Sequence, residues 1–336
     1  MNPSHISSGR SLSPILSPTH KVPQKSPRSS LFSSPGAVTE TALSPTPSYV
    51  KNFPFKAIFC DLDGTLLNSS KKISEKNVQI LNEFIEGGVH VVIATGRSVE
   101  AIKNVTAELK LRTPMIALNG KEIRCHMGAC TLDTSYLDDH LKESLFEYSK
   151  HLVSEYKVQN IYVAAESRSY ILNNIVEHID EYLKRDDGQL YPLDVHKPID
   201  EKVVNYLFLF KNDDIKNDFV RDHKKLLHDD IRITTFNGWP WVEVGASHAH
   251  KGAALEFVCE RLGITTDDVI AFGDGANDVE MLKCAGMGVA MGNADVHALE
   301  ASDTQTIHHD DDGVAHFLSK VTLEEKEAVG SKKTLL

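Results

Sequence analysis

Short apolar runs alternate with amphipathic segments along most of the chain after Phe55. Continuous apolar runs of this length are typical of strands buried on both faces of a parallel sheet. Helical spacing marks residues 74–87, with Ser74 placed to cap the first turn and Gly87-Gly88 to end the last, and also marks residues 251–262. The pattern predicts an α/β fold, a doubly wound, Rossmann-like parallel sheet with helices on both faces. The predicted strands are 56–62, 89–95, 115–120, 269–274 and 288–291.

The middle of the chain has a different pattern and predicts a separate α+β domain. Residues 158–172 and 231–244 resemble hairpins, the second with Asn237-Gly238 at its turn, and 205–210 resembles a further strand. Helices are predicted at 137–156, 173–184 and 214–227. We therefore expect the α/β core to be interrupted and later completed. The predicted division is core at 51–121 and 243–322, insert at 122–242 and a C-terminal tail at 323–336.

Residues 1–50 are rich in Ser and Pro and contain no acidic residue before Glu40, so we expect a disordered tail. A basic, acid-poor composition is typical of a transit peptide for a plastid or mitochondrion. Repeated Ser-Pro and Thr-Pro pairs are instead typical of a phosphorylatable tail on a cytoplasmic protein. The sequence leaves both interpretations open. The pairs begin at Ser13, Ser17, Ser26, Ser34, Ser44 and Thr46.

Composition excludes several classes of function. The formal net charge is −11, and residues 1–50 carry four basic and one acidic residue, or +3, which leaves −14 on the remainder. An acidic body disfavours binding to nucleic acid, and no apolar run approaches the ~20 residues that cross a membrane. The five cysteines have no zinc-site spacing, so we expect reduced, buried thiols in an intracellular protein. A monomer or weak homo-oligomer is expected.

Polar residues gather where the predicted strands end, and the carboxyl edge of an open α/β sheet is where ligands bind. Oxygen-rich carboxylate sites suit Mg²⁺, which often shares a substrate phosphate, and a lysine and a threonine can hold the remaining phosphate oxygens. One carboxylate can attack phosphorus while a second, two residues later, transfers protons. The residues that converge in this way are Asp61, Asp63, Gly64 and Thr65, Thr95 to Arg97, Asn119 and Gly120, Lys251, and Asp274 to Asp278.

Four segments, FCDLDGTLL, VVIATGR, HKGAAL and AFGDGANDVEML, resemble the four motifs of the haloacid dehalogenase superfamily of phosphohydrolases. The chain is most similar to the Cof-type (type IIB) subfamily, in which a large α+β cap lies between the second and third motifs. The resemblance covers about 56–320. It differs at Asp295-Val296-His297, where the subfamily often has lysines. The run from His308 to Asp312 is interpreted as a solvated loop.

The resemblance implies a role for each matching residue. Asp61 would be the nucleophile, and Asp63 would protonate the leaving group and then activate water. Mg²⁺ would be bound by Asp61, the backbone carbonyl of Asp63 and Asp274, with Asp278 in a supporting position. Arg97 would pair with a catalytic carboxylate or form a surface salt bridge. Contacts to phosphate or substrate are implied for Leu62, Thr95, Gly96, Arg97, Asn119, Gly120, Lys251 and Asn277.

These residues predict a Mg²⁺-dependent phosphomonoester hydrolase that acts on a small phosphorylated metabolite through an aspartyl-phosphate. A large cap closes over small substrates and excludes macromolecules. The broad expectation for the subfamily is a sugar phosphate. Alternatives are a phosphatase of a phosphorylated cofactor such as pyridoxal phosphate or a flavin nucleotide, a phosphomutase, or a phosphometabolite sensor without catalysis.

Overall fold

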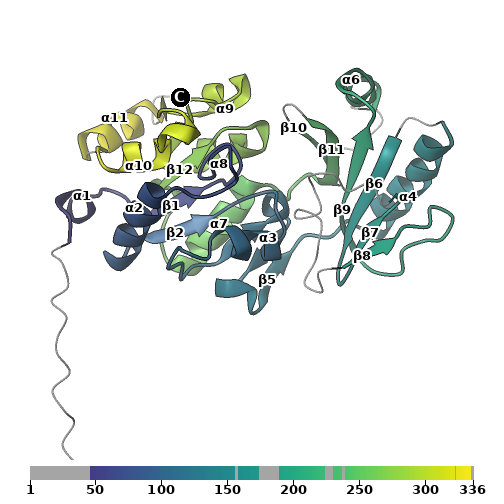
Figure 1. Cartoon of the computed structure of the whole chain (residues 1–336), viewed down its shortest axis with the longest axis horizontal. Helices are drawn as coiled ribbons and strands as arrows, with labels where there is room; N and C mark the ends of the chain where they lie inside the picture. The colour runs from purple at the N-terminus through teal and green to yellow at the C-terminus, as the bar shows by residue number, and fades with distance from the viewer. Residues whose placement is uncertain are drawn as a thin grey trace, which may run out of the picture. The chain divides into compact units, whose positions relative to one another are not determined.

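The computed structural model describes residues 46–155, 158–173, 189–223, 230–236, 239–321 and 323–333 (Figure 1). The predicted tail at 1–50 therefore lies almost wholly outside the described residues. A short helix, α1 (Ser48–Lys51), precedes the first strand. Within the described residues, no helix is long and apolar enough to cross a membrane.

A five-stranded parallel sheet forms the centre of the core, in the order β14-β13-β12-β1-β2. Residue Cys60 at the end of β1 is level with Phe272 in β12, so the residues that follow these two strands emerge side by side. Four predicted strands are confirmed, and the two-residue β14 was not predicted. The strands are β1 (Ala57–Cys60), β2 (His90–Ile93), β12 (Val269–Gly273), β13 (Met287–Ala290) and β14 (Thr304–Gln305).

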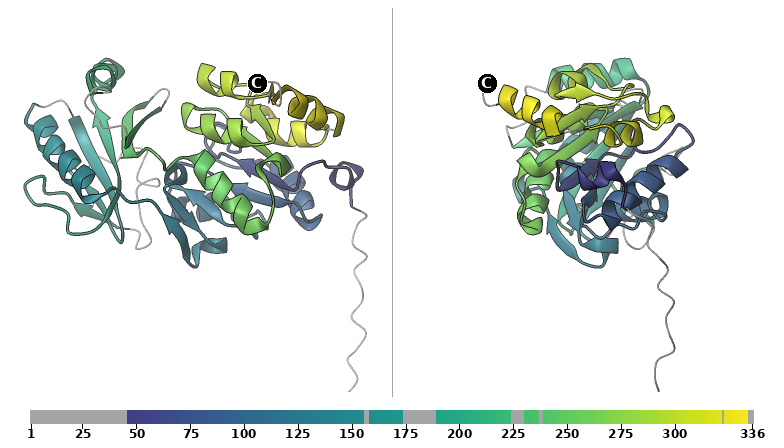
Figure 2. Two further views of the ribbon diagram at one scale, coloured as in Figure 1. Left: turned by 180° about the vertical axis from the view of Figure 1, so that it is seen from behind. Right: turned by 90° about the vertical axis from the view of Figure 1, so that its left-hand side faces the viewer.

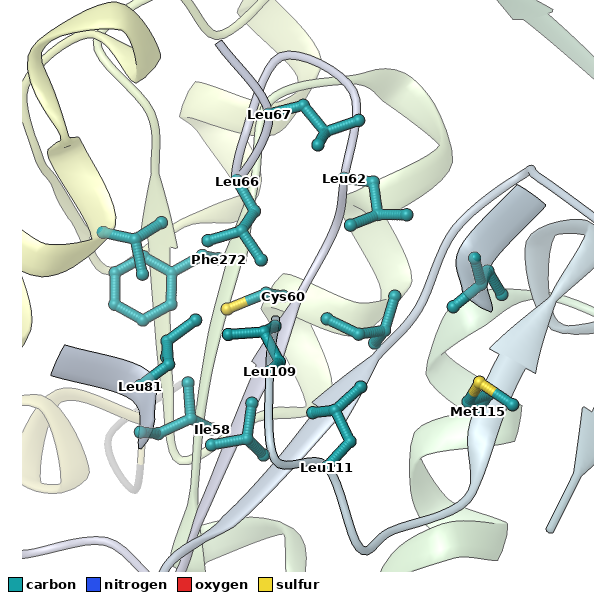
Figure 3. Close-up of a cluster of buried hydrophobic side chains, with 14 of the residues drawn as sticks. Ile58, Cys60, Leu62, Leu66, Leu67, Leu81, Leu109, Leu111, Met115 and Phe272 are labelled. Carbon is teal, nitrogen blue, oxygen red and sulfur yellow. The ribbon is translucent and has the colours of Figure 1, made fainter. Parts of the chain in front are cut away.

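Both faces of this core sheet are covered by helices, as the apolar runs predict. Ile58 and Cys60 face a cluster that includes Leu81 and Phe272 (Figure 3), together with residues of α2 (Glu75–Glu86) and α10 (Gly313–Leu318). Ala57 and Phe59 face the opposite cluster, which packs against α7 (Lys251–Leu262), seen in front of the sheet in the view from behind (Figure 2). Three further helices of the core are α3 (Val99–Val105), α8 (Val279–Cys284) and α9 (Val296–Ala301). The segment predicted as a C-terminal tail instead contains a helix, α11 (Leu323–Lys333), whose Val329 packs in the core cluster.

The strand predicted at 115–120 is shorter than expected and belongs to a different sheet. β3 (Met115–Ala117) meets β2 through a single parallel bridge, Ala94 with Ile116, and is followed by a tight turn at Leu118–Gly120. It pairs antiparallel with β4 (Glu122–Arg124), which in turn pairs with β5 (Thr131–Thr134). β4 and β5 lie within the predicted insert, which begins at residue 122. The position of this domain boundary stays a prediction.

The insert contains a six-stranded sheet, here called the cap sheet, in the order β10-β11-β9-β6-β7-β8. Its neighbouring strands are antiparallel except β7 and β8. Both predicted hairpins are confirmed, although the turn at Asn237-Gly238 and most of the helix predicted at 173–184 lie outside the described residues. The strands are β6 (Val158–Ala165), β7 (Ser169–Ile171), β8 (Leu190–Pro192), β9 (Val203–Phe210), β10 (Ile231–Phe236) and β11 (Trp239–Ala246).

One face of the cap sheet packs against two helices, α4 (Asp139–Ser154) and α6 (Asp213–His223), which confirm two predicted helices. Val242 and Val244 of β11 and Phe208 of β9 belong to the apolar cluster on this face. Because side chains alternate along a strand, Glu243 of β11 lies on the opposite face. That face also carries apolar side chains such as Trp241, and Glu243 is a charged side chain there that contacts the candidate site.

The cysteines differ in part from the expectation of buried thiols. None of the five forms a disulfide. Cys60 and Cys259 are buried as predicted, but Cys130 is exposed and Cys125 and Cys284 are half-buried. Cys125 and Cys130 lie at the ends of the hairpin between β4 and β5, where the backbone N–H of Cys125 donates to the carbonyl of Cys130. No strand or hairpin is predicted from the sequence at 122–134, so the count and spacing of the cysteines could not place these two thiols at an exposed turn.

Candidate active site

A buried lysine joins two carboxylates at the carboxyl edge of the core sheet. Asp61 directly follows β1, and its backbone N–H donates to the Phe272 carbonyl on the neighbouring strand. Lys251, the first residue of α7, is fully buried, and its Nζ lies 2.6 Å from Asp61 Oδ1 and 2.6 Å from Asp278 Oδ1. The ammonium thus neutralises part of a charge that burial would otherwise make costly.

The turn after Asp61 is shaped around Asp274. Thr65 Oγ1 donates to Asp274 Oδ1 at 3.1 Å. Gly64 has φ +80°, and a Cβ at this position would lie 2.2 Å from Asp274 Oδ2. Only glycine permits both this left-handed backbone and this close approach. Asp278 holds the other side of the loop, because its Oδ2 accepts from the backbone N–H groups of Asp274 and Gly275.

Asp61, Asp274 and Asp278 form a carboxylate cluster that suits a metal ion. Each offers an oxygen, and these oxygens lie within 4.8 Å of one another. Burial, with the neighbouring carboxylates, raises the pKa of Asp61 to about 7 and that of Asp274 to about 8. A hard divalent cation prefers an oxygen donor set of this kind and would relieve the repulsion within it. Asp278, expected in a supporting position, is a full member of this cluster.

Asp63 lies apart from this cluster and is held by cations of its own. Burial favours its neutral form, but hydrogen bonds from Arg97 and Lys71 outweigh burial and hold the pKa of Asp63 well below its usual range. Arg97 Nε and Nη2 donate to the two carboxylate oxygens at 2.6 and 2.8 Å, and Lys71 Nζ donates at 2.8 Å. Arg97 is only 1% exposed. Of the two roles considered for Arg97, the structure therefore favours pairing with a predicted catalytic carboxylate.

The remaining predicted residues line the same edge. Thr95 is buried, and its Oγ1 accepts from the Arg97 backbone N–H. Asn119, at φ +55°, accepts from Asn277 Nδ2 at 3.0 Å, which brings these two predicted contacts together across 158 residues of chain. The glycines at 96 and 120 allow close packing, since a Cβ on Gly120 would lie 2.4 Å from the His250 backbone. Leu62 has a fully buried side chain in the core (Figure 3), so only its backbone can face a ligand.

Two neighbouring segments that were given no role hold the loop after β1. Asn293 Nδ2 donates to the Gly64 carbonyl at 2.7 Å, and Asn293 Oδ1 accepts from the His309 backbone. His309 Nδ1 lies 2.7 Å from the Leu67 carbonyl, and the Asp310 carboxylate accepts from both the backbone and the hydroxyl of Ser69. The run 308–312 is partly exposed, as a solvated loop would be, with Asp310 and Asp311 at the surface. His309 and Asp310 nevertheless contact the loop that carries Asp63, which the prediction did not include.

Glu243 is a further residue that the sequence reading missed. It is buried on the face of the cap sheet opposite α4 and α6, and it accepts from Asn119 Nδ2 at 2.6 Å. Its partners in the chain are 124 and 38 residues away, at Asn119 and Asn205, so no local pattern marks it. An acidic residue between two valines of a predicted strand was the one available signal.

Together, a parallel α/β sheet with acids at its carboxyl edge and an inserted cap define a hydrolase of the kind the motifs predict. The family model for haloacid dehalogenase-like hydrolases matches residues 58–318. The chain belongs to this family.

Individual relatives agree with this assignment. A 5-amino-6-(5-phospho-D-ribitylamino)uracil phosphatase of Bacillus subtilis is 33% identical over 269 residues, which cover 77% of this chain and 93% of the relative. Among solved structures, a haloacid dehalogenase-like hydrolase from Bacillus subtilis is similar with a TM-score of 0.68 at 24% identity, over 79% of this chain and 99% of that one. A subclass IIB sugar phosphatase is similar in fold, with a TM-score of 0.65 at 22% identity, over 79% and 100%. The predicted family, subfamily and fold class are confirmed.

Proposed function

We propose that the protein is a Mg²⁺-dependent phosphatase of a small phosphorylated metabolite, and that Asp61 carries the phosphoryl group between two steps. The broader enzyme class, a hydrolase that acts on phosphate esters, is confirmed by the family and by the phosphatases among its relatives. The observation that carries the proposal is the buried Lys251, which bridges Asp61 and Asp278 beside Asp274.

In the first step, an Asp61 carboxylate oxygen attacks phosphorus, and the bond between phosphorus and the ester oxygen breaks. Lys251 holds Asp61 Oδ1, which leaves Oδ2 for the attack. The departing oxygen takes a proton from the Asp63 carboxyl. In the second step, Asp63 takes a proton from water, the water oxygen bonds to phosphorus, and the bond to Asp61 breaks. Phosphate is released, and both aspartates return to their starting states.

The phosphate would be held by the donors that surround Asp61. Lys251, Thr95 and Asn277 offer an ammonium, a hydroxyl and a carboxamide, and all three lie at the same sheet edge. The backbone that follows Asp61, including Leu62, adds N–H groups where the chain turns at Gly64. Such preorganised donors stabilise the charge of the transferring group and account for much of the rate in phosphoryl transfer.

A divalent cation, which we take to be Mg²⁺, would be held by Asp61, Asp274 and Asp278, together with the backbone carbonyl of Asp63. When bound, such an ion neutralises charge on the phosphate and on the carboxylates. The choice of ion rests on the all-oxygen donor set, which magnesium prefers.

Asp63 has to exchange a proton, and its contacts bear on when it can do so. Paired with Arg97 and Lys71, it is an anion, the form needed to take a proton from water. To donate a proton in the first step, it has to be protonated and to loosen its pair with Arg97. We therefore propose that Arg97 sets the charge of Asp63 during the cycle.

For the substrate, we propose a phosphorylated sugar or polyol. The curated relative at 33% identity acts on a pyrimidine that carries a 5-phospho-D-ribityl chain, and this class of phosphate ester joins a polyol to a ring. Such a molecule combines features of the two substrate classes predicted, the sugar phosphates and the phosphorylated cofactors such as pyridoxal phosphate or flavin nucleotides.

A screen of phosphate esters with Mg²⁺ tests this function, with Asp61→Asn as the blank. The panel includes sugar phosphates, 5-amino-6-(5-phospho-D-ribitylamino)uracil, pyridoxal phosphate and flavin mononucleotide. We expect phosphate release by the wild type and none by Asp61→Asn. Isomerisation without net phosphate release would indicate a phosphomutase, and binding without turnover a sensor. Release that persists in Asp61→Asn would rule out the covalent mechanism.

A further inference from the structure

A buried polar network surrounds Glu243, and it reaches the site through a chain of side chains. Glu243 is 2% exposed, and its Oε1 accepts from Asn205 Nδ2 and Lys121 Nζ, each at 2.6 Å. Its Oε2 accepts from Asn119 Nδ2 at the same distance. Asn119 Oδ1 in turn accepts from Asn277 Nδ2 at 3.0 Å. Glu243 is thus linked to a predicted phosphate ligand through one intervening side chain.

The chemistry of these groups fixes the direction of every hydrogen bond in this chain. An ionised carboxylate only accepts, so Asn119 has to present its NH₂ group to Glu243. The carbonyl oxygen of Asn119 then faces Asn277, whose NH₂ group donates a hydrogen bond to it. The opposite side of the Asn277 carboxamide, Oδ1, lies against Gly275, where a Cβ would be only 2.7 Å away. Glu243 therefore fixes the orientation of both carboxamides: the NH₂ group of Asn119 faces Glu243, and the NH₂ group of Asn277 faces Asn119.

An ordinary stabilising ion pair does not explain this arrangement well. Buried ion pairs contribute little net stability, because desolvation cancels most of the attraction. The surrounding chain is nevertheless shaped for this one, since a Cβ on Gly245 would lie 2.4 Å from Lys121 Cε. Lys121 is itself 2% exposed and neutralises the carboxylate without reaching Asn277. Burying the Glu243 carboxylate is unfavourable for folding, but its hydrogen bond fixes the orientation of the Asn119 side chain.

We propose that Glu243 is a positioning residue for the reaction, which acts through Asn119 to hold the Asn277 carboxamide with its NH₂ group available to phosphate. This inference rests on the proposed function, in which Asn277 contacts the phosphoryl group. An NH₂ group has two hydrogens, so Asn277 can donate to Asn119 and to phosphate together. A glutamine at 243 can present either end to Asn119, and both carboxamides then lose their fixed orientation.

A double-mutant cycle between Glu243→Gln and Asn277→Ala tests the proposal. The readouts are kcat/KM for p-nitrophenyl phosphate and the Kd for inorganic phosphate with Mg²⁺. We expect Glu243→Gln alone to weaken both by about tenfold, the effect of one hydrogen bond to a charged group. In the Asn277→Ala background the same substitution should change them by less than about twofold, because its effect travels through Asn277.

Asn205→Leu is the matched control, because Asn205 donates to the same carboxylate but has no contact with Asn119 or Asn277 among those described. It should lower the unfolding temperature while leaving kcat/KM within about twofold of the wild type. If Glu243→Gln fails to fold, Asn119→Leu breaks the chain at its middle and leaves the pair of Glu243 with Lys121 intact. Asn119→Leu should weaken kcat/KM and phosphate binding in the wild type, and should change them by less than about twofold in the Asn277→Ala background.

Additive effects of Glu243→Gln and Asn277→Ala would overturn the proposal. So would a loss of kcat/KM in Asn205→Leu as large as that in Glu243→Gln, when the two variants have the same unfolding temperature. Either result would leave the proposed function standing, because the wild type would still hydrolyse the ester. A wild type that neither hydrolyses p-nitrophenyl phosphate nor binds phosphate would overturn the proposed function, and this inference with it.

Discussion

At the scale of the residue, Arg97 and Asp63 form the pair whose chemistry is easiest to measure. Replacing Arg97 with Met removes a bidentate partner from a mostly buried carboxylate, so the pKa of Asp63 should rise. Because water activation needs the anion, the acid limb of kcat against pH should move to higher pH, with a loss of about tenfold on that limb for each pH unit of movement.

Lys71→Met is the control for Arg97→Met. Lys71 donates one hydrogen bond to Asp63, but its side chain is 55% exposed against 2% for Arg97, so water screens its charge. We expect a clearly smaller movement of the acid limb. Profiles that superimpose for wild type and Arg97→Met would show that Asp63 does not control that limb.

Gly64 gives a second test at the same scale. Gly64→Ala places a Cβ 2.2 Å from Asp274 Oδ2, so we expect a loss of activity of at least about a hundredfold, as the carboxylate cluster is displaced. Gly88→Ala is the matched control, because Gly88 also has a positive φ, of +92°, but has nothing within 4 Å of the added methyl. It should cost about 1–2 kcal/mol of stability and leave kcat unchanged. Equal activity losses in both variants would point to backbone strain alone.

The residues that could be predicted from the sequence are those whose position follows from a local pattern. Asp61, Thr95 and Asp274 each come directly after an apolar run, and parallel strands bring such positions to one edge. Glu243, Asn293 and His309 could not be found in this way. Their partners are 124, 229 and 242 residues distant, and such contacts exist only once the sheets have assembled.

At the scale of the element, the loop after β13 supports the loop after β1. Asn293 donates to the Gly64 carbonyl and accepts from the backbone of His309, so it ties three segments together. Asn293→Ala should lower kcat/KM by about tenfold, because the turn that carries Asp63 loses its tether. Ser69→Ala, which removes an exposed hydroxyl bonded to Asp310, should stay within about twofold. Comparable losses in both variants would mean that the outer contact, and not Asn293, secures the loop.

The elements themselves were predictable to different degrees. Four of the five core strands follow from apolar runs, and α2 follows from its helical spacing and from the Ser74 cap, whose side chain accepts from the Asn77 backbone as expected. β3 shows what such patterns omit. Its apolar residues resemble those of its neighbours, yet positive φ angles from Leu118 to Gly120 end the strand at Ala117 and turn the chain into an antiparallel ribbon. Partner choice depends on the turn, and the sequence pattern carries little of that information.

At the scale of the whole molecule, the carboxylate cluster links stability to pH and to the cation. Asp61 and Asp274 have pKa values raised to about 7 and about 8 in the folded protein, against about 3.9 in an unfolded chain. Without a cation, the folded state therefore binds more protons than the unfolded state across this window. The free energy of unfolding should fall as the pH rises from about 4 to about 8.

A bound divalent cation should reverse this loss, since it stabilises the ionised cluster that high pH creates. We expect Mg²⁺ to raise the unfolding temperature more at about pH 8.5 than at about pH 5.5, where protons compete for the same oxygens. Asp274→Asn is the informative variant, because it removes one charge from the cluster and one ligand from the proposed site. Its cation-free stability should vary less with pH, and Mg²⁺ should add little at either pH. Thermal unfolding of the wild type and Asp274→Asn at both pH values, with and without Mg²⁺, measures the four Mg²⁺-dependent gains in unfolding temperature. A gain from Mg²⁺ that is equal at the two pH values, or that persists in Asp274→Asn, would place the cation elsewhere.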